Sequence, residues 1–290
     1  MKKLLFAIAL AVSAVFTTAS AVNMFDYVPA DSAAAVRIDV DALLKRPEVI
    51  NALNTPEAKA KQLEFSAKTG CNIKDLQKAV IAVGDAGSGT LVLQLSKNID
   101  LAKALKSLGD ESGETRVANV VIYFKDPRTA ICQLSANVIA FGAVDDLKAL
   151  ISGKRGVPAA LKDLLPENGV FPPVFTAFYT GQIKGKASCE FAGKDQKDLL
   201  FTSVISFGKA KEAQQFVSML PMYAGMFSSI LFSSAPELGA KVVNALKYDV
   251  SAGKVSIRLL IDSELADGIG SMINEMGRKS AGAGKASQSK

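Results

Sequence analysis

Short turns between apolar segments constrain the fold of this chain most strongly. The segments VANVVIYF, TAICQL and NVIAFG follow one another within residues 117–142 and are joined only by the turns KDPR and SAN. Each segment has the length and apolar composition of a strand. Because a parallel crossover needs a dozen or more residues, turns this short require the neighbouring strands to be antiparallel. The sequence therefore predicts an antiparallel sheet here.

Helix signals accompany these strands. Thr55-Pro56-Glu57 combines a capping hydroxyl, a proline in the first turn and an acid near the positive helix end, and Gly70 is a typical residue for the helix to stop at. A long helical region at 209–246 precedes a hairpin, YDVSAGKVSIRLLI, with its turn at SAGK. We therefore predict an α+β fold in which antiparallel sheets pack against helices in two subdomains.

The two ends of the chain are not expected to belong to a folded domain. Lys2 and Lys3, an apolar run over 4–16 and the small-residue site Ala19-Ser20-Ala21 identify residues 1–21 as a signal peptide. This predicts export to the periplasm or beyond the cell. Residues 277–290 form a basic Gly/Ala/Ser/Lys tail that is expected to be disordered. Between the ends we expect subdomains at 22–152 and 174–276, separated by a proline- and glycine-rich boundary at 153–173.

The charge distribution argues against nucleic-acid binding. The formal net charge is +6, but the signal peptide carries +2 of this and the tail carries +4. The body of the protein is therefore neutral, and it offers no extended basic face for phosphates. We expect no nucleic-acid partner.

Catalytic chemistry is restricted because the chain contains no histidine. This excludes Ser-His-Asp and Cys-His catalysis and histidine-based metal sites. Asp39 and Asp41 form a D-x-D pattern, which we interpret as a solvent-facing strand residue followed by a helix cap rather than a metal site. We therefore expect no catalytic residues, no cofactor and no metal. The pairing of Cys71, Cys132 and Cys189 stays open, although strand alternation predicts that Cys132 is buried.

The most unusual segment is the stretch 213–236, in which 24 consecutive residues carry no charge. Apolar residues recur within it at helical spacing, and Pro221 predicts a kink or a break. A buried pair of core helices is the favoured interpretation. A surface for a protein partner, a second copy or an apolar ligand is the alternative. Serine and glutamine dilute the run too much for a membrane span, so we expect no integral membrane protein. The candidate surface consists of Phe216, Met219, Leu220, Met222, Tyr223, Met226 and Phe227.

Two segments carry a family resemblance. YVPADSAAAVRIDVDALLKRPEV resembles the opening of exported bacterial α+β proteins that begin with a Val-Pro-Ala-Asp turn. VVNALKYDVSAGKVSIRLLIDSELADGI resembles their helix–hairpin–helix ending. This group is an uncharacterised family, so the resemblance implies an α+β fold and leaves the function open.

These observations favour a non-enzymatic cell-envelope protein that acts by binding or scaffolding. The first alternative is a carrier for a lipid or another apolar ligand, which requires a cavity beside the candidate surface residues. The second alternative is a hydrolase that uses carboxylates, which requires two acids close together in a cleft. A scaffold predicts an apolar patch on the surface and no cavity.

Overall fold

A computed structural model describes residues 24–84, 89–106, 112–153, 156–167, 169–193 and 198–272. The signal peptide predicted at 1–21 and the tail predicted at 277–290 lie outside these ranges. The α+β prediction is confirmed, because helices pack against antiparallel strands throughout the described chain. The chain divides into two compact units between Ser188 and Cys189, and the division falls inside strand β9 (Ile183–Ala192).

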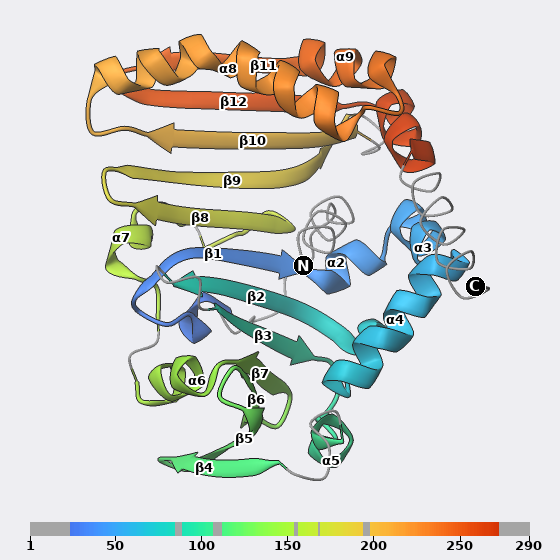
Figure 1. Cartoon of the computed structure of the whole chain (residues 1–290), viewed down its shortest axis with the longest axis vertical. Helices are drawn as coiled ribbons and strands as arrows, with labels where there is room; N and C mark the ends of the chain where they lie inside the picture. Colours follow the sequence, from blue (N-terminus) through green and yellow to red (C-terminus); the bar gives the residue numbers. More distant parts are fainter. Residues whose placement is uncertain are drawn as a thin grey trace, which may run out of the picture. The chain divides into compact units, whose positions relative to one another are not determined.

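The first unit is built on an antiparallel sheet (Figure 1). Its hydrogen-bonded order is β8 (Val174–Thr180), β1 (Ser32–Asp39), β2 (Leu76–Gly84), β3 (Gly89–Leu95), β7 (Val138–Gly142), β6 (Thr129–Ser135), β5 (Val120–Asp126) and β4 (Gly113–Val117). The predicted succession of strands joined by short turns is β5, β6 and β7, and both of its pairings are antiparallel. Short turns were therefore a reliable signal.

Both faces of this sheet are buried, as the alternation along β6 shows. Ala130 and Cys132 belong to one apolar cluster, and Ile131 between them belongs to another. The first cluster includes residues of η1 (Met24–Tyr27), α6 (Val144–Ile151) and α7 (Ala159–Lys162). The second includes residues of α2 (Val40–Leu44), α3 (Pro47–Leu53), α4 (Pro56–Thr69), η2 (Ile73–Asp75) and α5 (Leu101–Leu105).

The caps of α4 confirm the helix limits predicted from the sequence. The Thr55 hydroxyl oxygen accepts a hydrogen bond from the Ala58 backbone N–H at 3.3 Å. At the other end Gly70 adopts a left-handed φ of 69° and its N–H bonds to the Ser66 carbonyl. A side chain at Gly70 would also meet the backbone of Ala104, so both conformation and space require glycine there.

The boundary between the units differs from the one expected at 153–173. Strand β8, which follows that segment, pairs with β1 from Ala34↔Phe178 to Ile38↔Val174. Phe175 of β8 packs edge-on against Phe25 and Phe171, with ring centroids 6.0 and 5.4 Å apart. The proline-rich segment is therefore part of the first unit, where it carries α7 and leads the chain back to the sheet.

The second unit contains β10 (Asp198–Ser206), β12 (Lys254–Ile261) and β11 (Leu246–Ser251), hydrogen-bonded in that order. Helices α8 (Ala210–Leu231) and α9 (Pro236–Ala245) lie along the β11–β12 hairpin (Figure 1), and residues 263–272 are helical. The predicted hairpin is confirmed: Ser251 pairs with Lys254 around Ala252 and Gly253. Of the kink or break predicted at Pro221, the break is absent, because α8 continues through this residue as one helix.

Candidate functional site

Helix α8 carries the uncharged stretch, and its N-terminal half is packed on the sheet. Ala213 and Leu220 are buried against Val255 of β12, and Phe216 and Val217 pack around them. The Phe216 ring lies 5.2 Å from the ring of Phe207, which precedes the helix. The core interpretation therefore holds for this half of the stretch.

The C-terminal half of α8 exposes its apolar side chains. Met222 is 61% exposed, Met226 46%, Phe227 56% and Ile230 62%. We call these four residues the α8 strip. The core interpretation is wrong for this half of the stretch. Helical periodicity marks an apolar side of a helix, but it does not tell whether anything covers that side.

The structure divides the seven residues of the candidate surface by burial. Met222, Met226 and Phe227 belong to the exposed strip. Phe216, Met219 and Tyr223 are half-buried, and Leu220 is buried. Ile230 completes the strip four residues after Met226. It was part of the apolar periodicity in the sequence but not of the candidate list.

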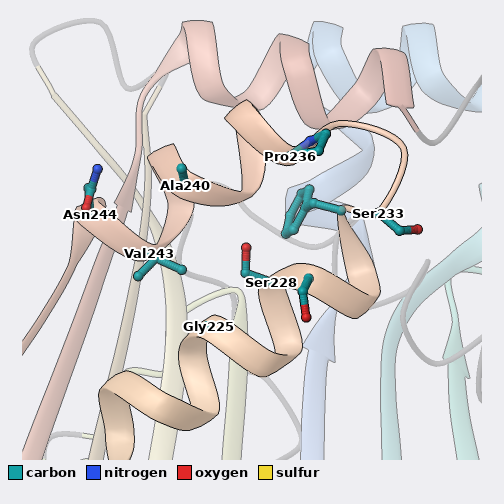
Figure 2. Close-up of a pocket in the computed structure, with 9 residues that line it drawn as sticks. Gly225, Ser228, Ser233, Pro236, Ala240, Val243 and Asn244 are labelled. Carbon is teal, nitrogen blue, oxygen red and sulfur yellow. The ribbon is translucent and has the colours of Figure 1, made fainter.

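A groove of about 520 Å³ runs between α8 and α9 (Figure 2). Close packing of the two helices closes part of it, because a side chain at Gly239 of α9 would meet the Ser228 hydroxyl and Phe232. None of the seven candidate residues lines the groove. Its lining residues are Gly225, Ser228, Ser229, Phe232, Ser233, Pro236, Ala240, Val243 and Asn244. The sequence signal for the groove is the set of small residues Gly225, Ser228 and Ser229 on α8.

The α8 strip lies in an uncharged part of the helix, since the stretch from Ala213 to Pro236 contains no Asp, Glu, Lys or Arg. Within the described ranges, no helix has the length and apolar character needed to cross a membrane. The chemistry available at this site is therefore apolar contact, with serine hydroxyls at its margin.

The D-x-D pair forms structural contacts in the first unit. Asp39 caps α2: one carboxylate oxygen accepts from the Ala42 N–H at 3.1 Å, and the other pairs with Arg37 at 3.3 Å. Asp41 is exposed and pairs with Lys45 at 2.7 Å. Asp39 is a strand residue as expected, the last of β1, but its side chain is half-buried and it is also the cap of α2. The capping role expected for Asp41 is wrong, because α2 begins at Val40. In the described chain, no three acid or cysteine residues cluster as metal ligands.

Arg37 is the most deeply buried charge of that cluster. Its guanidinium lies 5.0 Å from the centroid of the Phe171 ring and donates to the Pro172 carbonyl at 3.5 Å. Burial lowers the pKa of Arg37, and the neighbouring carboxylate of Asp39 opposes that shift. These contacts tie the segment before β8 to β1, which is a structural role.

Among the described residues, no disulfide joins any two of Cys71, Cys132 and Cys189. The predicted burial of Cys132 is confirmed, and burial raises the pKa of its thiol to about 12. A thiol that stays protonated in an apolar core is not a nucleophile at neutral pH.

Comparison with known proteins identifies no family. No family model matches the chain, and no curated protein matches it. Among solved structures, crystal form III of TP0453 is similar with a TM-score of 0.49 and 13% identity, covering 87% of this chain and 100% of that one. Crystal form I of TP0453 has a TM-score of 0.44 and 13% identity, covering 87% and 98% of the two chains. At this level the similarity says nothing about function.

Proposed function

We propose that this chain is an exported, non-enzymatic protein of the cell envelope that binds an apolar surface of a partner protein through the α8 strip. The observation that carries the proposal is the exposure of Met222, Met226, Phe227 and Ile230 on an uncharged helix. Soluble proteins rarely leave clustered large apolar side chains in water without a binding role. Methionine suits such a surface because its flexible side chain adapts to the shape of a partner.

Two further features support this class of function. The signal-peptide pattern at residues 1–21 supports a place in the envelope or outside the cell. The lack of histidine and the structural contacts of Asp39 and Asp41 give no support to catalysis. A binding role needs none of these groups.

The carrier alternative has weaker support. It expected a cavity beside the seven candidate residues, whereas the groove between α8 and α9 is lined by other residues and is not an enclosed cavity. The exposed strip lies on the surface, where a protein partner can cover it. The test below distinguishes a small apolar ligand from a protein partner by the mass of the crosslinked adduct.

The test places a photo-crosslinking phenylalanine analogue at Phe227 in cells that export the protein. The matched control carries the analogue at Tyr179, an exposed aromatic residue on β8. We expect one discrete protein adduct from position 227 and not from position 179. If the crosslinked species gains only the mass of a lipid, the protein is a carrier and the proposal is wrong. Identical adducts from both positions would also overturn the proposal.

The captured protein is then purified and its affinity is measured with variants of the intact exported chain. Met226→Glu places a charge in the strip and is expected to raise Kd at least about tenfold, which corresponds to about 1.4 kcal/mol. Gln215→Glu places the same charge on an exposed position of the same helix outside the strip, and should leave Kd unchanged. Equal Kd values for wild type and Met226→Glu would contradict the assignment of the strip.

A further inference from the structure

Strand β11 forms an edge of the sheet in the second unit. It is hydrogen-bonded to β12 on one side, and among the described strands it has no partner on the other. An edge strand presents unpaired backbone N–H and C=O groups that can pair with another strand. This edge is separate from the α8 strip.

The turn geometry identifies which backbone groups point outward. Ala252 and Gly253 have φ values of 46° and 79°, which is typical of a two-residue type I′ turn. Such a turn closes on a hydrogen-bonded pair, here Ser251 and Lys254, and the pairs then alternate along the ladder. Leu246, Tyr248 and Val250 therefore direct their backbone groups away from β12.

One contact in the structure agrees with this assignment. The N–H of Leu246 bonds to the carbonyl of Val243 at the end of α9, and so is not used by β12. The groups left for an incoming strand are the C=O of Leu246 and both the N–H and the C=O of Tyr248 and Val250. Tyr248 is the central residue of the three and is 41% exposed.

The charges on β11 are symmetric around Tyr248. Lys247 and Asp249 flank it, both are exposed, and neither forms an ion pair with another described residue. Lys247 stands directly opposite Arg258 of β12, and like charges in that position are unfavourable. A lysine on its own protects an edge strand from pairing. Here Asp249 gives the edge the opposite charge at the symmetric position.

We propose that β11 is a homodimer interface, in which a second copy pairs its own β11 antiparallel to this one around a two-fold axis at Tyr248. In that register the two Tyr248 residues exchange both backbone hydrogen bonds. Val250 of each copy donates its N–H to the carbonyl of Leu246 in the other copy. Lys247 then faces Asp249 of the second copy in a non-hydrogen-bonded pair, where side chains lie closest.

The helices are compatible with this arrangement in their charge. The two-fold axis keeps both copies of α8 on the same side of the joined sheet, because α8 packs on that side of β11 and β12 in each copy. The uncharged run from Ala213 to Pro236 introduces no like-charge repulsion between them. A closed two-fold contact uses the same residues on both copies, so it stops at a dimer.

Charge exchange tests this register. The mature chain, residues 22–290, is examined by sedimentation velocity over a concentration series at low salt. Lys247→Asp and Asp249→Lys each place like charges opposite one another across the seam. We expect each to raise the dimer dissociation constant at least about tenfold. The double variant, Lys247→Asp with Asp249→Lys, restores opposite charges and should return to within about threefold of wild type.

Two controls separate this interface from other causes. Lys59→Asp makes the same charge change on the exposed surface of α4 and should leave the dimer unchanged. Tyr248→Pro removes an outward N–H that β12 does not use, so the monomer should stay folded while the dimer is lost. A wild-type protein that is monomeric at every concentration would overturn the proposal. A dimer insensitive to the single charge changes, such as one formed by the α8 strip alone, would overturn it as well.

Discussion

At the residue scale, the burial of a side chain could be predicted from the sequence where the local periodicity of a strand determined it. Strand alternation in TAICQL was enough to predict that Cys132 is buried, and its thiol is fully inside the first core cluster. The cap was assigned to Asp41 instead of Asp39 because that choice depended on which residue begins α2, and the ends of elements are uncertain by one or two residues. Residue roles at a strand–helix junction therefore need the structure.

Burial of Cys132 predicts a specific loss of stability at high pH. The pKa of its thiol is raised to about 12 in the folded protein, whereas an unfolded thiol titrates near its ordinary value of 9.0. Above that value the unfolded chain releases the proton and the folded chain retains it. The free energy of unfolding therefore falls as pH rises from about 9 to about 12, by up to about 1.4 kcal/mol per unit.

The measurement is urea unfolding under reducing conditions at pH 8 and pH 10. Cys132→Ala is the control, because it keeps every other titrating group and removes this one. Wild type should lose about 1.4 kcal/mol more than the variant between the two pH values. Parallel losses in the two proteins would show that the Cys132 thiol ionises in the folded state.

At the element scale, the pattern of α8 predicted a helix correctly but predicted its burial only in part. Phe216 and Leu220 pack on the hairpin as expected, whereas Met222, Met226 and Phe227 project into solvent. The reason is that 22 helical residues lie over a small sheet, whose apolar cluster includes α8 residues only as far as Leu220. Period and composition are local, while the extent of the covering surface is set by strands elsewhere in the chain.

Pro221 lies inside α8, where it is expected to lower the stability of the helix. Proline removes the N–H that would bond to the carbonyl of Val217 and is roughly 3 kcal/mol less favourable than alanine in a helix interior. Since Pro221 is exposed, Pro221→Ala should raise the free energy of unfolding of the second unit by about 2–3 kcal/mol. Thermal unfolding followed by helical circular dichroism measures the change, with Ser218→Ala as a control expected to gain less than about 0.5 kcal/mol. An unchanged or lower stability would mean that the proline conformation is required at this position.

At the scale of the whole molecule, the chain divides inside β9, whereas the sequence placed a boundary at 153–173. Pro and Gly at 153–173 mark a change of chain direction, which is a local property. The pairing of β1 with β8 joins residues about 140 positions apart and leaves no local signal. The candidate site shows the same limit: the uncharged stretch was visible, but the groove also depends on α9, which was not separated from the long helical region.

Separate cores predict that damage in one unit stays in that unit. Phe175 is buried in the first unit against Phe25 and Phe171, and Phe175→Ala should cost about 3–5 kcal/mol there. Phe207 packs on Phe216 in the second unit and provides the matched variant, Phe207→Ala. Native-state hydrogen exchange should show lost protection in β1 and β2 for the first variant, and in β10 and β12 for the second. If either variant lowered protection equally in both sets of strands, the two units would unfold as one cooperative body, and the division inside β9 would have no energetic meaning.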